Sequence, residues 1–126
     1  MSIAIDTSSL VAFLEGDRGG DTGIIETAIE AHTLRIPGPV VTELISYPRV
    51  GAKVATLIED FPILDTTPGF WHRAGETRRK VLSKGLNAKI ADAQIVQLCL
   101  DYDMFLVTRD QDFRHFVKHC GLKLAV

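Results

Sequence analysis

Two hydrophobic patterns alternate along the chain. Short apolar runs of the kind that form buried strands occur at residues 2–5, 34–37, 62–65 and 104–108. Between these runs, apolar residues recur at helical spacing, as they do from Ile24 to Ile29. Strands that alternate with helices from end to end predict an α/β structure with a mainly parallel sheet.

Helix boundaries follow from residues that start and stop helices. Gly16, Gly85 and Gly121 are expected to end helices, and Asn87 is expected to cap the start of the helix at 88–102. The predicted helices cover residues 7–16, 22–32, 38–47, 50–61, 68–85, 88–102 and 112–119. Residues 122–126 are expected to add an edge strand, so the sheet should have four to five strands.

The composition is that of one globular domain spanning residues 1–126. Hydrophobic residues make up 46% of the chain and charged residues 24%, which allows a core without disulfide support. The two cysteines imply no disulfide framework, and the N-terminus lacks the pattern of a signal peptide. No run is apolar enough for a membrane helix, so we expect a cytoplasmic protein. The net charge of −2 gives no general attraction for nucleic acid.

Acidic residues recur where the predicted strands end. Asp6 ends the first strand, Glu43 lies one turn inside the helix after the second, and Asp110 and Asp112 follow the fourth. Asp92 lies near the start of the helix before the fourth strand. Because ligands of open parallel sheets bind outside the carboxyl ends of the strands, these acids are candidates for one site.

The position of Asp92 can be checked by length. From Asp92 to Asp101 the helix advances roughly 13 Å at 1.5 Å per residue. The strand from Met104 to Thr108 returns about 13 Å at 3.3 Å per residue. Asp92 and Asp110 should therefore meet at the same end of the sheet.

Each of these acids alone is more often a turn or capping residue than a catalytic one. Glu43 and Asp92 fit that reading poorly, because each interrupts an apolar helical segment where burying a charge is costly. Carboxylates that converge on one crevice repel each other, and a divalent cation relieves the repulsion. Oxygen ligands without histidine suit Mg²⁺ or Mn²⁺, and such an ion supports phosphodiester hydrolysis.

Four stretches of the sequence carry a family resemblance when taken in order. They are AIDTSSLVAFL from Ala4, VVTELIS from Val40, KIADAQIVQLC from Lys89 and LVTRDQDF from Leu106. Together they resemble the PIN-domain ribonucleases, and most of all the VapC toxins of type II toxin–antitoxin pairs. The resemblance covers the whole chain. It implies a three-layer α/β/α sandwich and an Mg²⁺- or Mn²⁺-dependent endoribonuclease that hydrolyses RNA by a metal-activated water. It also implies a homodimer that a cognate VapB-type antitoxin holds inactive, often by inserting an Arg among the acids.

The resemblance carries roles onto particular residues. The acids matched to catalytic positions are Asp6, Glu43, Asp92 and Asp110. Of these, Asp6, Asp92 and Asp110 are expected to hold the metal, and Glu43 a water or a second metal, with Glu43 as candidate general base. The accessory positions are Asp112, Thr7 or Ser8, and Thr108. One departure is DAQIVQ, from Asp92, where many relatives read DALIAA; it places Gln94 near the site rim.

Asp110 and Asp112 are expected to divide two tasks. Asp110 is nearer the strand end and should face the metal. Asp112 should cap the last helix or hold a water, so its loss should affect stability more than activity.

A basic segment precedes Asp92. Its residues are Arg73, Arg78, Arg79, Lys80, Lys84 and Lys89, and they are candidates for RNA binding. A solvated helix face explains the same charge pattern equally well. The neighbouring aromatic pair, Phe70 and Trp71, is expected to pack in the core or an interface more often than to stack a base.

Two other classes of protein remain open. A PIN-like RNA-binding or scaffold module without activity would share the fold, and a metal-dependent nuclease assay separates it from an enzyme. A phospho-receiver domain has a similar length and alternation. Its first strand is followed by paired acids and its last strand by a Lys, whereas here Asp6 stands alone and no Lys follows residues 104–108, so this class is disfavoured.

Overall fold

The computed structural model describes residues 2–49 and 51–125. Within that part of the chain, four parallel strands form one sheet in the order β3-β2-β1-β4. The strands are β1 (Ile3–Ile5), β2 (Leu34–Pro37), β3 (Ile63–Leu64) and β4 (Phe105–Val107). The helices are α1 (Thr7–Leu14), α2 (Thr22–Glu30), α3 (Gly38–Ser46), α4 (Ala52–Glu59), α5 (Phe70–Leu82), α6 (Ile90–Asp101) and α7 (Arg114–Cys120), with a 3₁₀ turn η1 at Gln111–Phe113.

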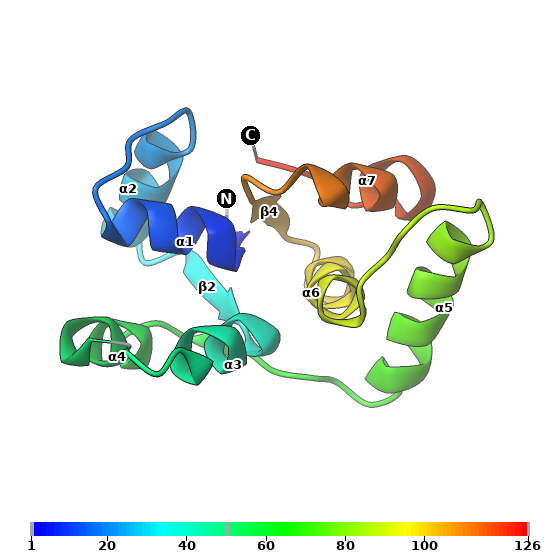
Figure 1. Cartoon of the computed structure of the whole chain (residues 1–126), viewed down its shortest axis with the longest axis horizontal. Helices are drawn as coiled ribbons and strands as arrows, with labels where there is room; N and C mark the ends of the chain where they lie inside the picture. The colour runs from blue at the N-terminus through cyan, green and yellow to red at the C-terminus, as the bar shows by residue number, and fades with distance from the viewer. Residues whose placement is uncertain (1, 50, 126) are drawn as a thin grey trace.

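The helices lie in two layers, one on each side of the sheet. The chain moves from β1 to β2 to β3 in one direction, then crosses the sheet back to β4. Because parallel crossovers are right-handed, this reversal puts α1–α4 and α5–α6 on opposite faces. Figure 1 shows α1, α2 and α4 on the left, α3 below β2, and α5 to α7 on the right. The expected three-layer α/β/α sandwich is confirmed.

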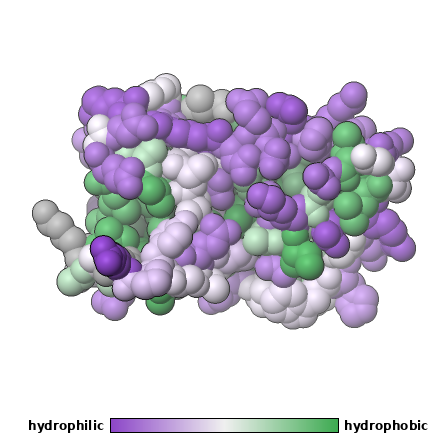
Figure 2. Space-filling model, in the orientation of Figure 1, coloured by the Kyte–Doolittle hydropathy of each residue, from purple (hydrophilic) through white to green (hydrophobic). Residues whose placement is uncertain are grey.

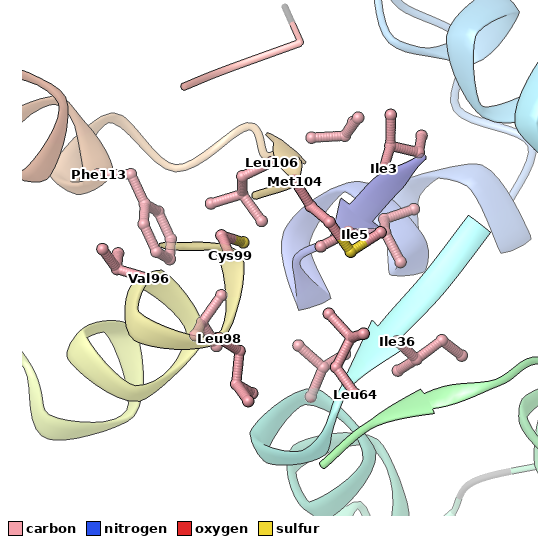
Figure 3. Close-up of a cluster of buried hydrophobic side chains, with 14 of the residues drawn as sticks. Ile3, Ile5, Ile36, Leu64, Val96, Leu98, Cys99, Met104, Leu106 and Phe113 are labelled. Atoms are coloured by element: carbon pink, nitrogen blue, oxygen red, sulfur yellow. The ribbon is translucent and has the colours of Figure 1, made fainter. Parts of the chain in front are cut away.

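The core lies between the sheet and its two helical layers. All three residues of β1 are buried, so the strand contacts apolar side chains on both faces. Figure 3 shows Leu98 and Cys99 of α6 on the side of the helix that faces the strands, and Val96 on its other side, beside Phe113. Helix α6 is buried on most of its surface. Asp92 and the other polar side chains on its buried positions are therefore unusual for a core helix.

The element types agree with the sequence predictions, and the differences concern boundaries. The N-cap of α6 is Lys89, so the prediction of an Asn87 cap is wrong. The segment 112–119 is divided into η1 and α7. Residues 122–125 form only an isolated bridge from Leu124 to Leu106, next to β4. The predicted helix start at residue 50 and strand end at residue 126 lie outside the described residues.

The aromatic pair at the start of α5 separates into two environments. Phe70 is 1% exposed and belongs to the core, as expected, whereas Trp71 is 65% exposed. Trp71 is therefore not a core residue, and the other half of the expectation, a position in an interface, stays a prediction. Among the described residues, no helix is long and apolar enough to cross a membrane.

Candidate active site

Asp6 lies where β1 passes into α1 and is 5% exposed. Two hydroxyls donate to its Oδ2 atom, Thr108 Oγ1 at 2.8 Å and Ser8 Oγ at 3.0 Å. Burial raises the pKa of Asp6, and these two hydrogen bonds oppose the rise because they favour the charged form. Asp6 is thus a buried carboxyl held in a fixed position by hydroxyls from two neighbouring strand ends.

The same two hydroxyls also fix the loop after β4. Ser8 Oγ accepts the backbone N–H of Arg109 at 3.0 Å, and Thr108 Oγ1 accepts that of Asp110 at 3.0 Å. Each hydroxyl therefore donates to Asp6 and accepts from the loop that carries Asp110. The strand ends of β1 and β4 are joined by side chains beyond the last ladder hydrogen bonds.

Glu43 reaches the same edge from α3. Thr7 Oγ1 donates to Glu43 Oε2 at 2.7 Å, which joins the first residue of α1 to the middle of α3. Glu43 is partly exposed, and among the described residues its Oε1 atom has no hydrogen-bond donor. One oxygen of this carboxylate is therefore held, and the other is available to a ligand.

Asp92 lies in the first turn of α6 and is 9% exposed. Its pKa is raised to about 6, first by burial and then by the charges of Asp6, Asp110 and Glu43, while Lys89 acts in the opposite direction. Hydrogen bonds through Thr7 and Thr108 also link Glu43 and the loop of Asp110 to Asp6 or the residue beside it. The four predicted acids are therefore gathered at the carboxyl edge of the sheet, although they come from four segments of the chain.

Asp110 lies deeper than Asp112, which is exposed. The Asp110 carboxylate accepts the backbone N–H of Asp112 at 2.9 Å and so caps η1. The expectation that Asp112 provides the cap is wrong, because the side chain that precedes the turn is better placed to reach its free N–H groups. Asp110 therefore combines a capping contact with a charge that acts on Asp92.

The basic residues before Asp92 lie in different places. Arg78 and Lys89 line a cavity of about 270 Å³ together with Asp92 and Asp112. Arg78 Nε donates to the carbonyl of Ala88 at 2.7 Å, which fixes its guanidinium at this cavity. The other basic residues do not line this cavity: Arg73 is paired with Asp101, and Arg79, Lys80 and Lys84 are exposed.

Among the described residues, no three Asp, Glu, His or Cys side chains are grouped tightly enough to form a preformed metal site.

The sequence model of the PIN domain family matches residues 3–118 of this chain. The chain therefore belongs to the PIN domain family. PIN domains are generally nucleases and typically use divalent metal ions.

Solved structures show the fold of this PIN domain in other proteins. It is similar to a chain of VapBC2 from Rickettsia felis, solved with a promoter DNA fragment, with a TM-score of 0.79 and 21% identity over 98% of this chain and 97% of that one. For VapBC-1 from nontypeable Haemophilus influenzae the TM-score is 0.76, with 16% identity over 98% and 96%. For a toxin–antitoxin complex from Klebsiella pneumoniae it is 0.70, with 17% identity over 96% and 95%. No curated protein matches the sequence.

One contact near the site of the PIN domain was not predicted. Arg109, between Thr108 and Asp110, turns away from the acids and pairs with Asp21 and Asp17, each at 2.9 Å. Its hydrogen bonds hold the pKa of Asp21 below the usual range. A Cβ at Gly19 would come within 2.8 Å of the Arg109 guanidinium, so a larger residue there would require the guanidinium to move. The partners are about 90 residues apart in sequence, and no local pattern signals such a pair.

Proposed function

We propose that this chain, as a single PIN domain over residues 1–126, is the VapC-type toxin of a type II toxin–antitoxin system and a metal-dependent endoribonuclease. The observation that carries the proposal is the group Asp6, Glu43, Asp92 and Asp110 at one edge of the sheet. None of these acids forms an ion pair with a Lys or Arg that the structure describes. A structural role alone gives no reason to gather uncompensated carboxylates, two of them buried, at one place.

The donor set fits a hard divalent cation, and we propose Mg²⁺ or Mn²⁺. The four side chains offer only carboxylate oxygens, which these ions prefer. The raised pKa of Asp92 marks an excess of negative charge that a cation would offset. We assign Asp6, Asp92 and Asp110 as its ligands, directly or through water, and Glu43 as the holder of a water or a second metal. When bound, the ion lowers the pKa of water and stabilises negative charge on a phosphoryl oxygen.

The chain's own residues supply positioning and proton transfer in this proposal. Ser8 and Thr108 hold the Asp6 carboxylate, and Thr7 holds Glu43 by its Oε2 atom. The remaining Glu43 oxygen, Oε1, is the acceptor for the proton that water loses as it attacks the phosphorus. Asp112 remains an accessory residue at the cavity beside Asp92.

Arg78 and Lys89 are the cations that we assign to the RNA backbone beside the scissile phosphate. They share a cavity with Asp92, whereas Arg79 and Lys80 of the predicted basic set do not line it. Loss of two phosphate contacts lowers the slope of log affinity against log salt by roughly one to two. Neutralising Arg78 and Lys89 should weaken RNA binding with that loss of slope, and the matched pair Arg79→Gln and Lys80→Gln should change it less. Equal effects in the two pairs would favour a solvated basic face.

The partner that we propose is a VapB-type antitoxin, with the toxin acting as a homodimer in the cytoplasm. The solved structures with a similar fold include VapBC complexes and a toxin–antitoxin complex. A groove of about 640 Å³ between α1, α3 and α4 is lined by apolar side chains that include Val11, Leu14 and Leu44. Hydrophobic surface is visible near α1 and α4 in Figure 2. An apolar groove suits an amphipathic segment of a partner protein.

The test is cleavage of RNA by the purified chain with and without divalent cation, together with growth after expression in a bacterial host. Asp6→Ala and Asp92→Ala should each abolish metal-dependent cleavage and growth arrest. Asp103→Ala, an exposed acid in the turn before β4, paired with Lys123 and at the opposite end of that strand from Asp110, is the control and should keep activity. Full activity in the Asp6 and Asp92 variants would overturn the assignment. Metal-independent RNA binding without cleavage by the wild type would favour a module without activity.

A further inference from the structure

A second cavity lies on the carboxyl edge of the sheet, at the ends of β2 and β3, on the side of β1 away from β4 and Asp110. It measures about 320 Å³, within the range of small-ligand sites, and lies where β2 and β3 end. Asp65 and Thr66 follow β3 directly, Thr42 comes from α3, and Gln94 comes from α6. None of the four clustered acids lines it, but Thr42 precedes Glu43 and Gln94 shares a helix with Asp92. The cavity is therefore separate from the acids and next to them.

An aromatic ring forms part of the wall of this cavity. Trp71 is the most exposed of the large apolar side chains in the part of the chain that the structure describes. Its ring meets the buried ring of Phe70 edge to face, with centroids 5.0 Å apart and planes at 83°. Phe70 is buried in the core, so the indole rests against a buried ring on one side, while Trp71 as a whole is 65% exposed. An exposed indole that rests on a core ring offers a stacking surface for another flat ring.

The polar side chains of this cavity have no partners in the described protein. The side chains of Gln94, Asp65 and Thr66 make no hydrogen bond to any residue between 2 and 49 or 51 and 125. An amide offers a donor beside an acceptor, and a carboxylate offers acceptors. A purely apolar ligand would leave these groups unpaired at a cost. A ligand that fits must therefore donate and accept hydrogen bonds as well as stack.

Charge separates this cavity from the one that holds Arg78 and Lys89. No Lys or Arg is among the described residues that line it, and Asp65 contributes a negative charge. A phosphate would be repelled here, whereas a neutral heteroaromatic ring would not. The carboxylate favours a base that donates, and guanine presents two N–H donors side by side on its Watson–Crick edge, next to an acceptor oxygen.

We propose that this cavity is a nucleobase subsite, in which a base next to the cleaved phosphate stacks on Trp71 and is read by Asp65 and Gln94, with guanine preferred. The proposal rests on the ribonuclease function proposed above and adds a determinant of sequence choice. Single-stranded RNA is recognised in this way elsewhere, because unpaired bases expose both their faces and their Watson–Crick edges.

The experiment uses the full chain, Mg²⁺ and a pool of short RNAs with random sequence, with the ends of the products sequenced. Binding of a short fluorescent RNA is measured separately in Ca²⁺. The wild type should favour guanine at one fixed position from the cut. Asp65→Asn and Gln94→Ala should weaken that preference while the pool is still cleaved. Trp71→Ala should weaken binding about 5- to 100-fold, and Trp71→Phe should recover most of the loss. His72→Ala, an exposed ring on the same turn that does not line the cavity, is the matched control.

The outcomes distinguish the two proposals. A wild type that neither binds nor cleaves RNA would overturn the proposed function and this inference together. Cleavage whose base preference is absent, or is unchanged in the Asp65 and Trp71 variants, would overturn the inference alone. Size-exclusion chromatography adds a further check. If Trp71→Ala alters the oligomeric state and leaves RNA binding intact, the ring belongs to a protein interface and the inference is wrong.

Discussion

Helix α6 has an aspartate near each end, and the two are in opposite environments. Asp101, at the end of the helix, accepts two hydrogen bonds from Arg73, at 3.1 and 2.7 Å, and one from Gln97 at 2.8 Å. Arg73 holds the pKa of Asp101 below its usual range. Asp92, in the first turn, has a raised pKa because it is buried near other acids.

This difference in pKa is opposite to the one that the helix dipole alone would produce. An acid in the first turn is stabilised by the helix dipole and an acid in the last turn is destabilised, each typically by 0.3–1 kcal/mol. The tertiary surroundings therefore outweigh the dipole at both ends. A side chain from another helix compensates Asp101, whereas Asp92 lies near carboxylates from three other segments. The Arg73 pair at the end of α6 stabilises the protein. At the start of α6, burial and neighbouring charges destabilise the Asp92 carboxylate, and a bound cation would offset that destabilisation.

The largest expected effect concerns activity. Asp92→Asn should reduce metal-dependent RNA cleavage at least about 100-fold, since the amide carries no charge for a cation. Asp101→Asn makes the same change at the other end of the same helix and should keep activity within about threefold of the wild type, because Asp101 contacts none of the four acids. Initial rates on a single RNA at saturating Mg²⁺ measure this contrast. Equal losses in the two variants would mean that the contrast between the helix ends has no functional meaning.

The next effect is the stabilisation of the protein by metal. A ligand that binds only the folded state adds about 2.7 kcal/mol to the free energy of unfolding at a hundred times its Kd. Mg²⁺ or Mn²⁺ should therefore raise the unfolding temperature of the wild type and of Asp101→Asn. It should leave that of Asp92→Asn nearly unchanged. Ca²⁺ and Na⁺ at matched ionic strength are the controls, and a shift that survives in Asp92→Asn would exclude this acid as a ligand.

In the absence of metal, Asp92→Asn should stabilise the protein. The folded-state pKa near 6 exceeds the ordinary 3.8, so at pH 7 the folded chain contains a carboxylate that prefers to be protonated. Removing the charge should add about 1–2 kcal/mol to the free energy of unfolding in EDTA. Below pH 6 the wild type gains stability as Asp92 binds a proton, so the difference should disappear near pH 4. Urea unfolding at pH 7, 5.5 and 4 tests this, and a destabilised variant at pH 7 would contradict it.

The smallest effect belongs to Asp101→Asn, which should lower the free energy of unfolding by about 1 kcal/mol because charge-assisted hydrogen bonds become neutral ones. The sign with pH is opposite to that of Asp92. A lowered pKa contributes stability above its unfolded value, and that stability is lost as the pH falls below about 4. The two curves of stability difference against pH should therefore separate as the pH rises from about 4 to 6 and stay apart at a constant distance above pH 6. Curves that coincide at pH 7 would contradict the comparison.

The sequence alone predicts the α/β alternation and the edge at which the acids meet, because both depend on local order along the chain. An acid directly after a strand must lie at the carboxyl edge, and the length of α6 brings Asp92 to that edge. The same rule applied to β3 would have found Asp65 and Thr66, which also follow a strand.

Contacts between distant segments were not predictable in this way. Arg109 pairs with Asp21, and Arg73 pairs with Asp101, only because the segments that carry them pack together. The sequence does not show how these segments pack. The cap of η1 could have been assigned to either aspartate, and only the backbone path decided for Asp110. The strands at 2–5, 62–65 and 104–108 were overestimated by one residue at one or both ends, whereas the strand at 34–37 was predicted with its exact bounds.

The edges of the sheet bear on how this protein avoids unwanted self-association. An exposed edge strand offers unpaired backbone groups to any other strand, and so invites aggregation. Here β3 has only two residues, and the C-terminal segment covers β4 through backbone hydrogen bonds from Leu106 to Lys123 and from Ala125 to Leu106. Lys123 adds a charge at that edge, paired with Asp103. The sheet is therefore poorly suited to grow by strand addition, and copies of this chain that associate should do so through their helices.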